Sequence, residues 1–257
     1  MNIIGIIPAR LASSRLPNKP MADILGMPMI GHVYLRSKLS EMLNEVYVAT
    51  CDKEIYEYIE SIGGKAVMTA NTHERASDRT AEALLTIEKA TGNKVDIIVM
   101  IQGDEPMVTP DMITASVEPL LSDSKLMITN LMAKMNSKEE HEDPAEVKVV
   151  VDKNSNAIYF SREPIPSRKK GVSDVPMLKQ VCIIPFRRDF LLEYNIMAQT
   201  PLEIIESVDM NRLIENDIKI KMVMRHEDTY SVDTTADLQN VNDKMKNDPL
   251  LEKYLCK

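Results

Sequence analysis

The stretch Ile3-Ile4-Gly5-Ile6-Ile7-Pro8-Ala9-Arg10 opens the chain with a short apolar run that ends at a proline and a cation. The run carries no polar side chain over residues 3–7, so a strand formed here would be buried on both faces. An amphipathic stretch at residues 29–39 follows it. Strands buried on both faces are typical of parallel sheets, whose crossover helices cover the two faces. The stretch therefore predicts the first strand–helix unit of an α/β protein.

The same alternation continues through the first half of the chain. Further strands are predicted at residues 46–49, 66–69 and 97–101, and the helices after them at 53–62, 79–89 and 110–121. In parallel sheets, ligands bind beyond the carboxyl ends of the strands. The loops at residues 8–20, 70–79 and 102–110 each follow a predicted strand, so we expect them to form the ligand site.

The pattern changes after residue 122, where predicted strands follow one another with little helix between them. We expect a β-rich insertion over about residues 125–190, which would serve acceptor binding or dimer contacts, inside a single domain of residues 1–245 with a tail at 246–257. The predicted elements are strands at 127–134, 147–151 and 157–160, a helix at 201–216, a strand at 218–224 and a closing helix from Thr234 onward.

Composition excludes several classes of function. The chain has 257 residues and a net charge of −8, which disfavours a nucleic-acid polymer as partner because such binding rests on many Lys and Arg contacts. Its three cysteines are far apart, so they indicate neither a disulfide framework nor a zinc site, and a reducing compartment fits. No apolar run approaches membrane-spanning length. We expect a cytoplasmic protein without a membrane partner.

The first loop concentrates positive charge and hydroxyl groups at a strand end. Arg10, Arg15 and Lys19 lie close together in sequence with Ser13 and Ser14. Such a cluster suits an anionic ligand, because Arg can hold two phosphate oxygens at once and Lys acts as a point charge. The loop lacks the spacing of a Walker A motif. For an arbitrary cluster of this size, a solvated basic turn is the alternative interpretation.

The loop at residues 102–110 offers a carboxylate directly after a buried strand. Gly103 permits close backbone approach, and Asp104 is the first candidate ligand for Mg²⁺, which prefers oxygen ligands and keeps several waters. Asp233 is a second candidate, again at a predicted strand end. The alternative for Asp233 is an N-cap of the helix that starts near Thr234. In the same way, Ser77-Asp78 can be an N-cap for the helix at 79–89.

These loops together resemble the signature of the 3-deoxy-manno-octulosonate (Kdo) cytidylyltransferases, the CMP-Kdo synthetases. The likeness spans about residues 1–240. Its further landmarks, in matching order, are Gly63-Gly64 with Val67-Met68-Thr69, residues 73–79, Gln102-Gly103-Asp104-Glu105-Pro106, Val147-Lys148-Val149-Val150, Tyr159-Phe160-Ser161-Arg162 with Ile165-Pro166, and Ser231-Val232-Asp233-Thr234. Asn18 departs from the glycine that is usual in the family, and Ala76-Ser77-Asp78-Arg79 from its Ser-Gly-Thr-Glu/Asp-Arg pattern.

The resemblance implies a fold, a reaction and a site. The fold would be the three-layer α/β/α, Rossmann-like sheet of the nucleotide-diphospho-sugar transferases, in a homodimer. The reaction would move CMP from CTP to a small acidic acceptor in lipopolysaccharide or surface-glycan biosynthesis. The residues implied for the nucleotide are Pro8, Ala9, Arg10, Ser13, Ser14, Arg15, Lys19, Ser77, Arg79 and Gln102, with Asp104 and Asp233 for Mg²⁺.

The expected chemistry is an in-line attack of the acceptor hydroxyl on the α-phosphorus of CTP. The protein would contribute positioning and electrostatic stabilisation. Asp104 would hold the metal, and Lys19 and Arg15 would stabilise the departing pyrophosphate. A lowered pKa of the acceptor hydroxyl would remove the need for a histidine base.

The acceptor side departs from the family pattern. Where Kdo enzymes carry His-Leu-Gly-x-Tyr-x-Tyr, this chain has Gln180-Val181-Cys182-Ile183-Ile184-Pro185-Phe186, and a Glu-Gln pair on a helix is replaced within Val208-Asp209-Met210. An acidic acceptor still fits, and a related 3-deoxy-2-ulosonic acid such as a nonulosonic acid is expected. The candidate acceptor residues are Lys148, Arg162, Gln180, Asp209 and Arg212, although a surface or helix-face charge is an even alternative for Arg212.

Two further interpretations stay open. One has the same chemistry on a smaller acid such as a phosphonate. The other is a catalytically silent, nucleotide-binding homodimer. Retention of both Asp104 and Asp233 beside the full basic loop argues against the silent alternative, since binding alone would tolerate the loss of one aspartate.

Overall fold

The computed structural model describes residues 1–13, 15–172 and 174–255 of the chain. Its centre is a five-stranded sheet with strand order β11-β6-β1-β4-β5, in which β11 alone runs antiparallel to its neighbour. The strands are β1 (Ile3–Ala9), β4 (Glu45–Thr50), β5 (Ala66–Met68), β6 (Ile97–Ile101) and β11 (Ile183–Arg187). The predicted parallel sheet of the first half is confirmed.

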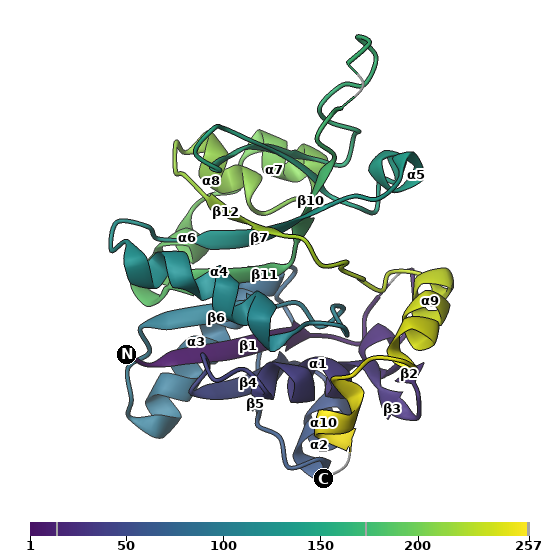
Figure 1. Cartoon of the computed structure of the whole chain (residues 1–257). Helices are drawn as coiled ribbons and strands as arrows, with labels where there is room; N and C mark the ends of the chain where they lie inside the picture. The colour runs from purple at the N-terminus through teal and green to yellow at the C-terminus, as the bar shows by residue number, and fades with distance from the viewer. Residues whose placement is uncertain (14, 173, 256–257) are drawn as a thin grey trace.

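Helices cover both faces of this sheet, as the fully apolar strands require. Alternate residues of β1 point to opposite sides: Ile4 and Ile6 belong to one apolar cluster, and Ile3 and Ile7 to the other. The first cluster is completed by α3 (Ala76–Thr91) and α6 (Arg188–Ile196), and the second by α1 (Met29–Lys38), α2 (Lys53–Ser61) and α4 (Pro110–Ser122). The result is a three-layer α/β/α arrangement (Figure 1).

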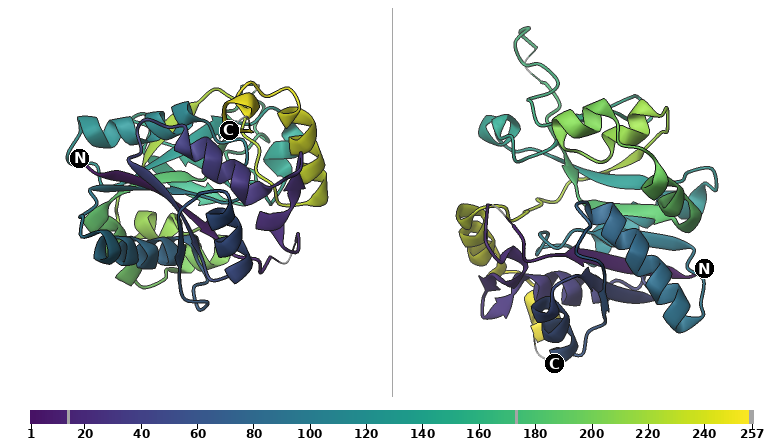
Figure 2. Two further views of the ribbon diagram at one scale, coloured as in Figure 1. Left: turned by 90° about the horizontal axis from the view of Figure 1, so that it is seen from below. Right: turned by 180° about the vertical axis from the view of Figure 1, so that it is seen from behind.

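A second sheet of mixed direction continues from the β11 edge. Its strand order is β12-β7-β10-β8-β9, and an isolated bridge from Ile128 to Phe186 connects it with β11. Figure 2 shows the second sheet beside the first, beyond its β11 edge, rather than packed on one of its faces. The strands are β7 (Thr129–Lys134), β8 (Lys148–Val151), β9 (Ala157–Ser161), β10 (Leu178–Val181) and β12 (Lys221–Arg225), accompanied by α5 (Lys138–Glu142), α7 (Pro201–Glu206) and α8 (Asn211–Glu215).

Three expectations about these elements need correction. The predicted helix at 201–216 is interrupted between α7 and α8, where Ser207 adopts the left-handed conformation with φ of 52°. The β-rich region is not a closed insertion, because β11 belongs to the first sheet and β12 to the second. The helix predicted at 79–89 begins earlier, with Arg75 rather than Ser77-Asp78 as its N-cap.

The C-terminal segment packs on the domain instead of forming a separate tail. After α9 (Thr235–Met245), the chain returns to α1 through α10 (Leu251–Leu255), as Figure 1 shows in yellow. Tyr254 is buried and shares a 2.8 Å hydrogen bond with His32 of α1. Arg36 of α1, also buried, pairs with Asp248. In the described part of the chain, no helix combines the length and apolarity needed to cross a membrane.

Candidate active site

The first loop after β1 is shaped by a short helix. Residues Lys19–Met21 form a 3-10 helix, η1, which is followed by the small hairpin of β2 (Asp23–Ile24) and β3 (Met27–Pro28). Asn18 precedes η1 in the left-handed conformation, with φ of 56°. Asparagine tolerates this region better than most residues, so it can stand in for glycine here without changing the backbone path.

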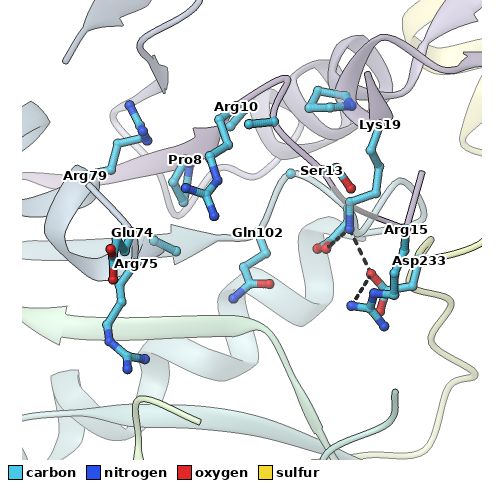
Figure 3. A pocket seen from close by; sticks show the side chains of 16 residues that line it. Pro8, Arg10, Ser13, Arg15, Lys19, Glu74, Arg75, Arg79, Gln102 and Asp233 are labelled. Atoms are coloured by element: carbon cyan, nitrogen blue, oxygen red, sulfur yellow. Dashed lines mark hydrogen bonds and ion pairs between the residues drawn. The ribbon is translucent and has the colours of Figure 1, made fainter. Parts of the chain in front are cut away.

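Lys19 lies between the two predicted metal ligands. Its Nζ is 2.7 Å from Asp104 Oδ2 and 2.9 Å from Asp233 Oδ1, and Arg15 Nη2 is 3.0 Å from the same Asp233 oxygen (Figure 3). Burial lowers the pKa of Lys19, but the two carboxylates outweigh it and raise the pKa above its ordinary value. Two carboxylate oxygens therefore converge on one point, which the ammonium group of Lys19 occupies.

Backbone contacts bring the two aspartates together. Asp104 follows β6, and its carbonyl oxygen accepts a 2.9 Å hydrogen bond from the N–H of Val232. Gly103 is packed closely, since a Cβ there would lie 3.2 Å from the Pro8 carbonyl oxygen. Thr234, not Asp233, is the N-cap of α9 and forms a capping box with Asp237. The N-cap alternative for Asp233 is therefore wrong, and its carboxylate is left to face Lys19.

A cavity of about 330 Å³ opens at the carboxyl ends of β1 and β6. Figure 3 shows Lys19 and Asp233 at one end of it, Glu74 and Arg75 at the other, and Gln102 between them. We call it the nucleotide pocket. Its lining includes these sequence candidates: Pro8, Ala9, Arg10, Ser13, Arg15, Lys19, Arg79, Gln102, Asp104 and Asp233. Ser14 lies outside the described residues.

Two candidates from the loop at 70–79 behave differently from each other. Arg79 is 3% exposed and contacts Thr69 and the Ala70 carbonyl through Nη1, while its Nη2 has no hydrogen-bond partner among the described residues. A buried donor without a partner is costly, so this nitrogen suits a polar atom of a bound ligand. Ser77 does not line the pocket; it is fully buried and donates to Asp209 at 3.0 Å.

A second cavity of about 210 Å³ adjoins the first and shares Arg15, Lys19, Gln102, Asp104 and Asp233 with it. We call it the acceptor pocket. Ile184, where the family has a tyrosine, is part of its wall. Three of the predicted acceptor residues also line it: Arg162, Gln180 and Asp209.

The other two acceptor candidates are structural, which corrects the sequence interpretation. Lys148 is fully buried, and its Nζ donates to the carbonyl oxygens of Asp143, Glu146 and Arg162. Burial lowers its pKa. Arg212 is 3% exposed and holds the buried Glu203 through contacts of 2.6 and 2.7 Å. Neither side chain lines the acceptor pocket.

The polar groups of the remaining candidates are also partly engaged. The guanidinium of Arg162 donates to backbone carbonyls, among them Glu206 and Pro144, both at 2.9 Å. The side-chain amide of Gln180 donates to Asn130 at 2.6 Å. Both residues therefore shape the wall of the acceptor pocket more than they supply free hydrogen-bond donors to it.

Sequence analysis missed several lining residues. Glu74 and Arg75 face the nucleotide pocket, and Glu105 and Glu146 face the acceptor pocket. Burial, and secondarily the charge of Asp104, raises the pKa of Glu105 to about 8. The sequence could have indicated Glu105, because it directly follows Asp104 and ligands bind beyond the carboxyl ends of the strands.

The described residues fit a divalent cation as two aspartates plus ligand oxygens rather than as a closed protein cage. They contain no group of three or more His, Cys, Asp or Glu side chains placed to hold a metal. Asp104 and Asp233 nevertheless converge on one point. Mg²⁺ is commonly held by one or two carboxylates together with substrate phosphates and water, which matches this donor set.

Comparison with known proteins agrees with the geometry. A family model described as "Cytidylyltransferase" matches residues 4–220. The chain is 41% identical to a 3-deoxy-manno-octulosonate cytidylyltransferase of Fusobacterium nucleatum, with 96% of this chain and 98% of that protein covered. It is 38% identical to the protein of the same name from Geobacter metallireducens, over 95% and 98%.

A solved structure extends this likeness to three dimensions. It is a CMP:2-keto-3-deoxy-manno-octonic acid synthetase complexed with CTP, which is 36% identical, has a TM-score of 0.86 and covers 96% of this chain and 99% of that one. The silent alternative is therefore not supported. The chain belongs to the 3-deoxy-manno-octulosonate cytidylyltransferase family, and it is a CTP-dependent nucleotidyltransferase.

Proposed function

We propose that the enzyme transfers CMP from CTP, with Mg²⁺, to a hydroxyl group of Kdo or of a closely related 3-deoxy-2-ulosonic acid, and releases pyrophosphate. The observation that carries the proposal is the position of Lys19, Asp104 and Asp233, which line both the nucleotide pocket and the acceptor pocket. A group transferred between two ligands must pass through such a shared boundary. The names of the relatives support Kdo-like acids as the acceptor class.

The chain's own residues divide the chemistry between them. Asp104 and Asp233 would hold Mg²⁺, whose charge would offset that of the α-phosphate and lower the pKa of the acceptor hydroxyl. Lys19 and Arg15 are placed to stabilise negative charge on the leaving pyrophosphate. Gln102 lies between Arg75 and Lys19 in the nucleotide pocket (Figure 3), where it would separate the base of a bound nucleotide from its phosphates.

The test is pyrophosphate release from CTP with Kdo, nonulosonic acids and small phosphonates as separate acceptors, and with other nucleoside triphosphates as controls. Release with CTP and Kdo, dependent on Mg²⁺, is expected. Asp104→Asn should lower turnover at least about 100-fold with the fold intact, since removal of one electrostatic stabiliser typically costs that much. Asp111→Asn, an exposed aspartate on α4, is the matched control. Release with only a phosphonate would overturn the acceptor class, and normal turnover of Asp104→Asn would remove that aspartate from the mechanism.

We also propose that the enzyme is a homodimer that uses an exposed apolar surface of β9 and α7. β9 ends this sheet, and Ile158 on it is 53% exposed. On the adjoining α7, Ile204 and Ile205 are 59% and 74% exposed. A group of exposed isoleucines is a surface that often marks a protein–protein contact.

A further inference from the structure

Arg75 connects the nucleotide pocket with the wall of the acceptor pocket. It precedes α3 with extended backbone and lines the nucleotide pocket. Its guanidinium reaches out of α3 to two acidic residues of the other half: Nε lies 3.0 Å from Glu203 Oε1, and Nη1 lies 2.5 Å from Asp209 Oδ1. Asp209 lines the acceptor pocket. One side chain therefore joins the two substrate sites from the side opposite Lys19.

Glu203 gives this connection a fixed anchor. It is fully buried on α7, and Arg212 of α8 holds both of its oxygens. Arg212 in turn lies over the ring of Tyr194, with 4.7 Å between the guanidinium carbon and the ring centroid. Side chains locked in this way lose little further entropy when a ligand binds. Because Glu203 is fixed, a movement of Arg75 would displace Asp209 and residues 207–210 rather than Glu203.

Asp209 is held almost entirely by the first turn of α3. Its Oδ1 faces Arg75, and its Oδ2 accepts a 3.0 Å hydrogen bond from Ser77. Its backbone carbonyl accepts a 2.9 Å hydrogen bond from the hydroxyl of Tyr194. The left-handed Ser207 marks the break between α7 and α8 just before it. The carboxylate of Asp209 therefore depends on Arg75 and Ser77 for its position, while Val208 and Met210 on either side of it are buried in the core.

We propose that Arg75 is a positioning residue that makes binding of CTP order the wall of the acceptor pocket. The inference rests on the proposed function of the two pockets. A nucleotide beside residues 74–79 restricts Arg75, and Arg75 then restricts Asp209 and residues 207–210. When the acceptor binds, residues 207–210 are already ordered, so less conformational entropy is lost. The two substrates therefore bind with positive coupling. In-line transfer needs this because a small displacement of the attacking oxygen costs a large factor in rate.

The test needs only CTP. In the full-length enzyme, CTP should slow amide hydrogen exchange at residues 207–212 roughly fivefold or more, a size typical of coupling between sites. Arg75→Met keeps the apolar length of the side chain and leaves Glu203 paired with Arg212 and Asp209 paired with Ser77. It should abolish the protection of residues 207–212, while CTP still protects the loop at residues 8–13.

A matched control removes another arginine ion pair of α3, one whose residues do not line either pocket. Arg188 of α6 holds Glu88 near the end of α3, with Nη2 2.7 Å from the carboxylate. Arg188→Met should keep the CTP-dependent protection even where it lowers the melting temperature. Loss of protection in both variants would reduce Arg75 to a general structural role, and retention in Arg75→Met, or absence in the wild type, would overturn the coupling.

A kinetic arm separates this inference from the proposed function. With Kdo as acceptor, Arg75→Met should raise the KM for Kdo roughly fivefold or more at saturating CTP and change kcat less, because the wall is poorly ordered but the phosphate contacts remain. Wild-type enzyme that shows the exchange effect but releases no pyrophosphate with Kdo would reject the acceptor assignment and leave the coupling standing.

Discussion

At the scale of single residues, the site is organised around one cation between two carboxylates. Lys19 occupies the point that Mg²⁺ would approach under the proposed mechanism, so the lysine and the metal would compete for the same oxygens until bound phosphates offered the lysine another partner. This explains how two aspartates can lie together before CTP binds.

The competition predicts the behaviour of Lys19→Met. Without the ammonium group, Asp104 loses its ion pair and Asp233 keeps the one with Arg15, so Mg²⁺ should raise the melting temperature of the variant more than that of the wild type, by roughly 2–4 °C for each kcal/mol of binding. Turnover should fall about 100-fold or more. Differential scanning calorimetry with and without MgCl₂ measures the first effect, and Lys53→Met, an exposed lysine on α2, is the control. Equal shifts in all three proteins would show that Lys19 and Mg²⁺ do not share these oxygens.

Local charge patterns in the sequence predicted which residues gather in the nucleotide pocket. They did not predict which groups each charged side chain contacts. The basic loop and Asp104 each carry their signal within a few residues, and the structure brings them together. The prediction of Lys148 and Arg212 as acceptor residues was wrong because the sequence does not show the contacts that each cation makes in the fold. Lys148 donates to backbone carbonyls, and Arg212 pairs with a buried carboxylate. Arg75 was missed for the same reason, since Asp209 is 134 residues away.

At the scale of elements, the contact between α1 and α10 predicts a pH dependence of stability. His32 is fully buried, and its Nε2 lies 2.8 Å from the Ile24 carbonyl oxygen, which can only accept. Nε2 therefore carries the proton, and Nδ1 accepts from Tyr254. Burial lowers the pKa of His32 below 6.5; the Ile24 carbonyl and the more distant Asp23 and Asp248 oppose this shift, and Arg36 adds to it.

The sign of the effect follows from linkage. Because the folded pKa is depressed, the unfolded chain binds the proton first as the pH falls below about 6.5, and the free energy of unfolding decreases from there down to the folded pKa. One such proton contributes at most about 1.4 kcal/mol per pH unit. Urea unfolding between about pH 7.5 and about pH 5.5 should show a smaller decrease for His32→Gln than for the wild type. The exposed His226→Gln should keep the wild-type slope, and an unchanged slope in His32→Gln would contradict the assignment.

Element boundaries show where periodicity stops being informative. The sequence pattern from 201 to 216 is helical throughout, yet the helix is interrupted at the left-handed Ser207. The break lets Asp209 accept a hydrogen bond from Ser77 of α3 and Asn211 accept one from Phe160 of β9. By contrast, β1 and β6 were predicted well, since a run that is apolar on both faces has few alternatives to a central strand.

At the scale of the whole molecule, the two sheets could not be separated from sequence alone. β10 and β11 are separated only by Cys182, but β10 pairs with β7 and β8, whereas β11 completes the first sheet beside β6. Strand periodicity reports which face is buried and not which partner is chosen, so a single β-rich insertion was the natural expectation. The switch between sheets matters for function because Gln180 and Ile184, on either side of it, both line the acceptor pocket.

The exposed isoleucines of β9 and α7 lead to the last prediction, which concerns assembly. If β9 and α7 form the dimer contact, a charge placed among the isoleucines would be buried without a partner, at a cost of several kcal/mol. Ile205→Glu should therefore raise the dimer dissociation constant at least about tenfold, and sedimentation velocity over a dilution series measures it. Leu85→Glu, at a side chain on α3 that is 48% exposed, is the control and should sediment as the wild type does. If Leu85→Glu dissociates and Ile205→Glu does not, the contact lies on the α3 face, and the exposed isoleucines of α7 face solvent in the dimer as well.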